Sequence, residues 1–364
     1  MPTLNNVKNR LLILPPSVIS GCERESCKED FESLEDKCIG EGAFGSVWKV
    51  RHKKTKQVFA IKVMNKENII RHNMIEQINK EIEIMYKLEH PHIIKLYSHF
   101  EDDEHFYLIM EYASKGQLFS LIKKHKKLNQ VSAKHYMKEI ISAVKYLHTR
   151  CPPIIHRDIK PENILIDDEG RCKLGDFGWA HFDNGVKIIE TYCGTPEYLA
   201  PEMINQCGHD KSVDIWALGI LLFEMLTGRT PFNLCGYNNQ LYNSIKVLNI
   251  NWTDDFPLLA KDLVSKILCL NPDDRLNLDE IINHQWFRAT PSLRPFLNNI
   301  NYNDKSKLKI HLIHGNSQND KKINYINSKK KVLIKLIKND ENSFKETNIN
   351  TNRNNNNIIS KGFY

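Results

Sequence analysis

Several features of membrane and metal-cluster proteins are missing from this sequence. None of its apolar runs approaches the roughly 20 residues that a membrane-spanning helix needs. The nine cysteines include no CxxC pair and no Cys/His spacing typical of zinc sites, which favours reduced thiols inside a cell. The early stretch LLILPP is too short for a secretion signal and is better explained as a linker or docking segment.

Excess positive charge is lacking from most of the chain and is concentrated near its end. Residues 288–364 carry 15 Lys and Arg against 5 Asp and Glu, whereas the net charge of the whole chain is only +7. This segment is rich in Asn and Lys and poor in aromatic residues, which is typical of disorder. We therefore expect a flexible leader at 1–30, a folded domain at 31–287 and a low-complexity tail at 288–364.

The tail contains one stretch with a different pattern, KKKVLIKLIK at 329–338. It could form a short basic amphipathic helix, or it could be a solvated charge run, because isolated helices of this length are marginal in water. The lysine clusters could bind acidic membrane surfaces, nucleic acid or microtubules.

The folded domain changes its hydrophobic pattern along its length. The alternating stretches 38–50 and 57–64 predict strands joined by a glycine-rich turn, and 106–112 predicts a buried strand. Spacings of three and four predict an amphipathic helix over 75–88, and most of the later segments are helical. The result is an α+β fold with a β-rich lobe at 31–113, a helical lobe at 114–287 and a ligand site at their junction.

The glycine-rich turn has the spacing Gly40-x-Gly42-x-x-Gly45. This spacing also occurs in dinucleotide-binding Rossmann folds, but there the glycines lead into a helix, whereas here a second strand follows. A strand–loop–strand flap can lay backbone amides over phosphates. Lys62, on a buried strand, needs an anionic partner because unpaired burial of its charge is costly.

The later motifs complete a resemblance to a known family. HRDIKPEN at 156–163 is followed by DFG at 176–178, APE at 200–202, Asp214 and Arg275. In this order, and together with the flap and Lys62, they make residues 31–287 resemble a eukaryotic protein kinase. Fold and activity are thereby implied: a bilobal enzyme that transfers phosphate from ATP.

This resemblance assigns roles to matching positions. Lys62 and Glu81 would form the ion pair that orients the α- and β-phosphates of ATP. Asp158 would accept or orient the proton of the substrate hydroxyl, and Lys160 would meet the γ-phosphate. Positioned cations suit this reaction because charge spreads over the phosphate oxygens in the transition state.

The same resemblance implies ATP and Mg²⁺ as cofactors. Asn163 and Asp176 match the magnesium ligands. The other contacts with ATP are expected from the flap, the strand after it and the hinge that follows Met110, namely Ile39, Gly40, Gly42, Gly45, Val47, Ala60, Glu111 and Ala113.

Four further positions match the stacked spine of active kinases: Met85, Leu96, His156 and Phe177. His156 is therefore expected to pack in the core rather than to act as an acid or base.

Substrate preference also follows from the resemblance. KPEN after HRD, and Thr195 in the substrate platform, are typical of serine/threonine kinases. Glu162 matches the glutamate that binds an arginine upstream of the phosphoacceptor. Gln117 and Asn243 are neutral where the most arginine-demanding kinases have acids, so a moderate preference for upstream arginine is expected.

The motifs DFGWA, TYCGTPEYLAPEM and HRDIKPENIL are most similar to the Aurora family, with the AGC and polo-like families next. GTPEYLAPE departs from the usual Aurora sequence at this position. An Aurora-like kinase would act in mitosis and the cell cycle, in the cytoplasm or nucleus and at the spindle or centrosome, with an activator docked on the smaller lobe. An AGC-like signalling kinase and a pseudokinase scaffold are the alternatives.

The loop before Thr195 contains the expected switch. Thr191 matches the activating phosphosite of Aurora and AGC kinases, and Arg157, Lys80 and His181 could bind its phosphate. The residues before it, 188–190, are Ile-Ile-Glu rather than basic, so we expect slow self-phosphorylation without an activator or a second kinase.

Overall fold

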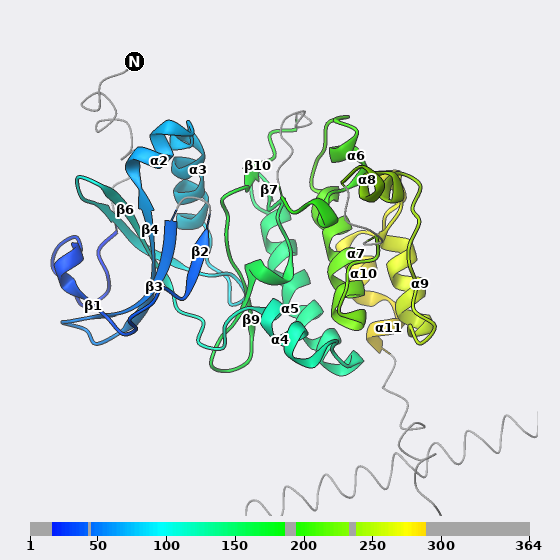
Figure 1. Cartoon of the computed structure of the whole chain (residues 1–364), viewed down its shortest axis with the longest axis horizontal. Helices are drawn as coiled ribbons and strands as arrows, with labels where there is room; N and C mark the ends of the chain where they lie inside the picture. The colour runs from blue at the N-terminus through cyan, green and yellow to red at the C-terminus, as the bar shows by residue number, and fades with distance from the viewer. Residues whose placement is uncertain (1–16, 43–44, 186–193, 233–237, 289–364) are drawn as a thin grey trace, which may run out of the picture. The chain divides into compact units, whose positions relative to one another are not determined.

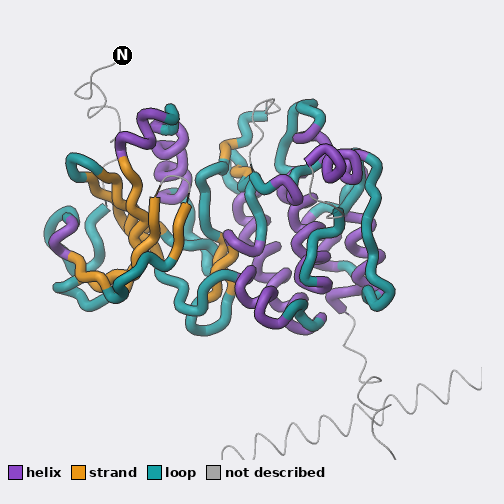
Figure 2. The backbone as a smooth tube through the Cα atoms, in the orientation of Figure 1, coloured by secondary structure: helices purple, strands orange, loops and turns teal. Residues whose placement is uncertain are grey.

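A β-rich lobe and a helical lobe make up the described part of the chain (Figures 1 and 2). The computed structural model describes residues 17–42, 45–185, 194–232 and 238–288. This arrangement confirms the α+β, bilobal fold that the sequence predicts. Within these residues, no helix has the combined length and apolarity needed to cross a bilayer.

An antiparallel sheet forms the smaller lobe, with strand order β1-β3-β4-β6-β5 and with β2 paired to β3. Its strands are β1 (Phe31–Ser33), β2 (Gly40–Gly42), β3 (Gly45–His52), β4 (Val58–Asn65), β5 (Leu96–Glu101) and β6 (His105–Glu111). The predicted strands around the glycine-rich turn are thus confirmed. Gly45 is required where β3 meets β4, because a Cβ atom there would lie 1.9 Å from the carbonyl oxygen of Val63.

Two helices, α2 (Lys66–Arg71) and α3 (Ile75–Tyr86), follow β4. Ile78, Ile82 and Met85 of α3 are buried in the same core cluster as Leu108 of β6, so the predicted amphipathic helix packs on one face of the sheet. Burial of this apolar stripe, rather than helix propensity, stabilises a helix of this length.

The opposite face of the sheet is covered by residues that we expected in a flexible leader. Ile19 is only 2% exposed and packs with Phe59 and Tyr107. A 3-10 turn, η1 (Lys28–Asp30), then leads into β1, and Arg24 pairs with Asp30 at 2.8 Å. For residues 17–30 the prediction of flexibility is wrong, because a single buried isoleucine and local polar contacts hold them to the sheet.

The larger lobe is mainly helical, as predicted. Its helices are α4 (Leu118–His125), α5 (Gln130–His148), α6 (Pro201–Ile204), α7 (Ser212–Thr227), α8 (Asn238–Lys246), α9 (Leu258–Ile267), α10 (Leu278–Asn283) and α11 (Gln285–Arg288). Short strands β7 (Ile154–Ile155), β8 (Ile164–Ile166), β9 (Cys172–Leu174) and β10 (His181–Phe182) frame the loops that carry the motifs, together with the 3-10 turns η2 (Pro161–Asn163), η3 (Pro196–Tyr198) and η4 (Pro272–Asp274).

Helix α7 is the central support of this lobe and is buried along most of its length. Its Asp214 is fully buried and accepts hydrogen bonds from the backbone N–H groups of His156 and Arg157, at 2.9 and 2.8 Å. The side chain of His148 lies 2.8 Å from the same carboxylate. A buried carboxylate thus holds the start of the HRD loop against α7.

The Glu202 carboxylate forms two hydrogen bonds of 2.7 Å with Arg275, and both side chains are buried. This pairing fixes the end of the APE motif to the lobe.

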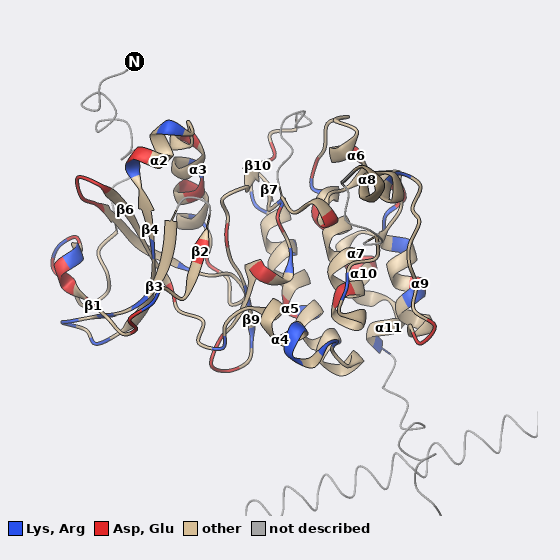
Figure 3. Cartoon of the chain, viewed as in Figure 1, with Lys and Arg blue, Asp and Glu red and all other residues tan. Residues whose placement is uncertain are grey.

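Charged residues of both signs are distributed over both lobes (Figure 3). The C-terminal end of α4, which carries Lys123 and Lys124, is one basic spot in this mixed surface.

Candidate active site

An ion pair joins the sheet of the smaller lobe to α3. The Nζ atom of Lys62, on β4, lies 2.7 Å from Oε1 of Glu81, whose side chain is 4% exposed. Asp176 of the DFG motif contributes a second carboxylate, 4.0 Å from the same ammonium. Burial alone would lower the pKa of Lys62, but the two carboxylates outweigh it and the pKa is raised. Lys62 is therefore held as a cation between the two lobes.

The predicted spine residues lie together in the core. Met85, Leu96, His156 and Phe177 are all at most 4% exposed, and the three apolar ones belong to one buried cluster. The rings of His156 and Phe177 pack edge to face with centroids 4.9 Å apart. His156 also makes a 3.1 Å contact with the carbonyl oxygen of Gly175, which agrees with a packing role.

Residues of the HRDIKPEN loop converge on one carboxylate, that of Asp158. Its Oδ2 atom accepts a hydrogen bond from Asn163 at 2.7 Å and forms an ion pair with the ammonium of Lys160 at 2.9 Å. Lys160 also donates to Oγ1 of Thr195 at 2.8 Å. The fold therefore brings Thr195, from the later GTPEYLAPE segment, to three residues of the HRDIKPEN loop.

The second oxygen of Asp158 has no such partner. Its Oδ1 atom is buried and accepts no hydrogen bond from the described residues. It faces Gly194, since a Cβ atom on that glycine would lie 3.4 Å from it. A buried acceptor without a donor is uncommon in native structures and is found where a site has a catalytic role or binds an ordered water.

Asp176 stands next to this loop. Burial alone would raise the pKa of its carboxyl. Lys62 and the backbone N–H of Gly178 outweigh this effect, so the pKa is lowered. Its side chain is nevertheless half exposed, which leaves an ionised carboxylate accessible. Such a group is suited to bind a divalent cation.

The residues predicted to contact ATP lie on β2 and just before it, on β3 and β4, and at or just after the end of β6. Ala60 and Ala113 are buried, whereas Ile39 is 41% exposed. Ile39 donates its N–H to the carbonyl oxygen of Val47 at 2.8 Å, which places both side chains in the flap. The side chain of Glu111 pairs with Lys173 at 2.5 Å, and its backbone N–H donates to the carbonyl oxygen of Lys95 at 2.9 Å.

A second group of carboxylates lies beyond Thr195. Glu224 of α7 is 9% exposed and accepts a 2.5 Å hydrogen bond from the hydroxyl of Tyr198. Burial raises the pKa of Glu224, and Glu162 and Glu197 raise it further, although the hydrogen bond from Tyr198 lowers it. The negative charges of these three acids therefore repel one another, and a bound cation would reduce this repulsion.

Glu197 and Glu224 were missed by the sequence analysis. The signal for Glu224 is a second acid, besides Asp214, in a helix that is otherwise mostly apolar, since burial of an acid is costly without a partner.

Cations gather on the other side of the HRD loop. The ammonium of Lys80, on α3, contacts Nδ1 of His181, on β10. Arg157 donates through Nε to the carbonyl oxygen of Trp179 at 2.7 Å. Burial, together with the nearby Lys80, Arg157 and His209, lowers the pKa of His181 to about 4. The predicted phosphate-binding residues Arg157, Lys80 and His181 therefore lie close together, whereas Thr191 lies outside the described residues.

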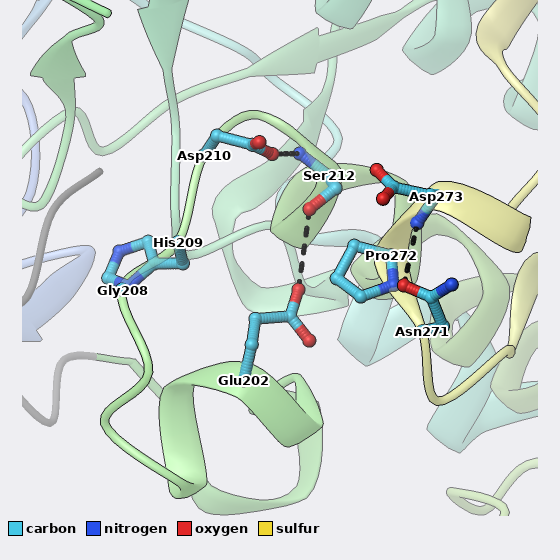
Figure 4. A pocket seen from close by; sticks show the side chains of 8 residues that line it. All are labelled: Glu202, Gly208, His209, Asp210, Ser212, Asn271, Pro272 and Asp273. Carbon is cyan, nitrogen blue, oxygen red and sulfur yellow. Dashed lines mark hydrogen bonds between the residues drawn. The ribbon is translucent and has the colours of Figure 1, made fainter. Parts of the chain in front are cut away.

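A small polar pocket of about 70 Å³ lies behind the APE motif (Figure 4). Its residues bond one another: Ser212 donates from its hydroxyl to Glu202 at 3.4 Å and from its N–H to Asp210 at 2.8 Å. These contacts hold Glu202, and with it α6, in place. None of the residues predicted to bind ATP, magnesium or substrate lines this pocket.

The fold and the ordered motifs define a protein kinase, and comparison with known proteins gives the same class. The family model described as protein kinase domain matches residues 34–287. Since this match covers well over half of the 364 residues, the chain belongs to the protein kinase family.

Within this family the chain is an Aurora-like serine/threonine kinase. It is 40% identical to the Aurora kinase of Saccharomyces cerevisiae over 271 residues. This aligned region covers 74% of this chain and 72% of that protein. The Aurora kinase of Dictyostelium discoideum is 39% identical over 73% of this chain and 68% of its own length. The cAMP-dependent protein kinase catalytic subunit of Dictyostelium discoideum is also 39% identical, over 79% of this chain and 42% of that protein.

Proposed function

We propose that the chain transfers the γ-phosphate of Mg-ATP to serine and threonine hydroxyls of proteins. The observation that supports this most directly is the buried Oδ1 atom of Asp158, which lacks a hydrogen-bond donor among the described residues. An unsatisfied buried acceptor costs free energy, and a substrate hydroxyl would supply the missing donor.

In the proposed reaction, the substrate hydroxyl donates its hydrogen bond to Asp158. The hydroxyl oxygen forms a bond to the γ-phosphorus, the bond from that phosphorus to the bridging oxygen of ADP breaks, and the proton passes to the Asp158 carboxylate. Lys160, 2.9 Å from Asp158 and 2.8 Å from Thr195, is placed to stabilise charge on the transferred group.

Asn163 and Asp176 fit the proposed magnesium site. Asn163 donates two hydrogen bonds through Nδ2, to the carbonyl oxygen and to Oδ2 of Asp158, so its amide oxygen is the atom available as a ligand. The lowered pKa of Asp176 keeps its carboxylate ionised. A bound Mg²⁺ ion would supply charge neutralisation at the β- and γ-phosphates.

We infer that the kinase domain spans residues 31–287, with the smaller lobe and hinge at 31–113 and the larger lobe at 114–287. Residues 17–30 are packed against this domain.

Substrates with arginine upstream of the phosphoacceptor fit the acidic group of Glu162, Glu197 and Glu224. A guanidinium is the cation best matched to paired carboxylates, because it presents several N–H donors in a plane. Thr195, bound to Lys160, would hold the substrate segment next to Asp158.

The direct test uses the purified full-length protein with Mg-ATP and three peptides that share an upstream arginine and differ only in Ser, Thr or Tyr. Transfer to Ser and Thr that stops when EDTA removes the metal is the expected result. Phosphate transfer to the Tyr peptide alone would contradict the proposal. Absence of transfer to any of the three peptides, even by protein phosphorylated at Thr191, would also contradict it and would support a pseudokinase scaffold.

Resemblance to Aurora kinases supports a role in cell division, at the spindle or centrosome, with an activator bound to the smaller lobe. The likeness to the cAMP-dependent kinase supports the AGC-like alternative. Localisation of the tagged chain through the cell cycle distinguishes them, because only the first role requires mitotic enrichment at the spindle or centrosome.

The basic tail would contribute binding to acidic surfaces or microtubules. Deletion of residues 300–364 should then weaken binding to microtubules and to anionic vesicles and reduce its dependence on salt. Unchanged binding would remove the tail from this role.

A further inference from the structure

Residues 17–22, here called the strap, lie across the face of the smaller-lobe sheet that α3 does not cover. The side chain of Ile19 is 2% exposed and is inserted among apolar residues of β3, β4, β5 and β6, namely Val50, Phe59, Ile61, Phe100, Tyr107 and Ile109. The N–H of Cys22 donates to the carbonyl oxygen of Ile19 at 2.9 Å, which closes a turn at the end of the strap. The strap and α3 therefore sandwich the sheet (Figure 1).

The strap also reaches the end of α3. The hydroxyl of Ser17 donates to the carbonyl oxygen of Tyr97 on β5, and its N–H lies 3.4 Å from the hydroxyl of Tyr86. Tyr86 is the last residue of α3, and its hydroxyl makes a 2.7 Å hydrogen bond with Nδ1 of His99, also on β5. Strap, strand and helix end thus meet at one tyrosine hydroxyl.

Side chains of helix α3 make polar contacts with different segments of the chain at two places along the helix. Towards its middle, Gln77 donates to the carbonyl oxygen of Gly178, and Lys80 contacts His181, so these contacts depend on the DFG segment. At its end the contacts depend on β5 and the strap. Glu81 lies between the two sets and five residues before Tyr86, about 7.5 Å along the helix axis.

We propose that the strap positions α3 for catalysis: Ile19 anchors it to the sheet, and Ser17 and Tyr86 transmit that position to Glu81 and hence to Lys62. The chain's own leader would then steady the helix from outside the kinase domain. This inference rests on the proposed role of the Lys62–Glu81 pair. Its test must therefore distinguish a failure of the strap's positioning role from a failure of the role of the ion pair.

The experiment measures kcat and KM of the full-length chain carrying Ile19→Asp, with the neighbouring Val18→Asp as the matched control. Val18 is 48% exposed, so its replacement adds the same charge without removing the anchor. Ile19→Asp should lower kcat about tenfold, Tyr86→Phe should lower it less, and Val18→Asp and Ile19→Leu should stay within twofold of the unmodified chain. Thermal melting shows whether each variant is folded.

A double-mutant cycle with Glu81→Gln identifies the mechanism. If the strap acts through Glu81, Ile19→Asp should change kcat by less than twofold in the Glu81→Gln background. A full tenfold loss in both backgrounds, or no loss from Ile19→Asp alone, overturns the positioning role. If Glu81→Gln by itself has no effect, the failure lies with the role of the ion pair instead. Faster hydrogen exchange of α3 amides in Ile19→Asp, but not in Val18→Asp, is the expected structural signature; unchanged exchange also counts against the proposal.

Discussion

Lys62 and Glu81 are joined by a 2.7 Å ion pair between β4 and α3, with Glu81 almost completely buried. The pair joins a strand to a helix, and α3 could shift relative to β4 while the hydrogen bonds between the strands stay intact. Its formation therefore depends on where α3 lies.

Replacement of Glu81 by Gln should lower kcat/KM roughly 10²-fold, because it removes one partner of a buried charge pair and leaves Lys62 less well oriented. Steady-state kinetics with a Ser peptide measure the effect. Glu83→Gln is the matched control, since Glu83 lies on the same helix in an exposed pair with Lys87 at 2.6 Å. Equal losses in the two variants would show that the effect is not specific to the pair.

Replacement of Glu224 by Gln should raise KM for a peptide with upstream arginine by about tenfold or more, because it removes a desolvated carboxylate from the cation site. Gln keeps an oxygen that can accept the hydrogen bond from Tyr198, so the local packing is preserved. The control is a peptide with alanine in place of arginine, for which the variant and the unmodified chain should have similar KM values. An equal change for both peptides would argue against the arginine site.

His181 should make stability depend on pH in the acidic range. Its folded-state pKa of about 4 lies below the value of about 6.5 for an unfolded histidine, so the unfolded state binds more protons between these values. Its contribution is complete above about pH 6.5 and is lost as the pH falls towards 4. His181→Gln should therefore reduce the loss of melting temperature between pH 7 and pH 5. The exposed His125 at the end of α4 provides the control substitution, which should leave the pH dependence unchanged.

Thr191→Val should lower activity strongly, because no phosphate could then bind beside Arg157, Lys80 and His181. Phosphorylation of Thr191 should raise the pKa of His181, since a nearby dianion favours the protonated imidazole. Activity assays and histidine NMR titrations of both forms measure these effects. Full activity of Thr191→Val would contradict the switch, and fast, complete modification of Thr191 by the isolated enzyme would contradict the expected need for an activator or second kinase.

The fold and the main site could be predicted because each of their signals is local. The alternating strands, the spacing of apolar residues in α3 and the HRD and DFG motifs all occur within short stretches of sequence. The strap and Glu224 could not be predicted in this way. Ser17 meets Tyr97 across 80 positions, and Tyr198 meets Glu224 across 26, so each role is created by tertiary contact. Ile19 and Val18 are adjacent aliphatic residues with no periodic apolar pattern around them, and only the folded sheet shows that Ile19 is the buried one.

The most direct test of the account is Asp158→Asn in the full-length chain, assayed for transfer of the γ-phosphate to a serine peptide. Asn keeps the size of the side chain but removes the carboxylate that would take the proton. Phosphate transfer should fall by a factor of about 10² to 10⁴, the usual contribution of a general base, while binding of ATP is retained. Transfer at close to the unmodified rate would contradict the central claim that the unpartnered oxygen of Asp158 receives the substrate hydroxyl.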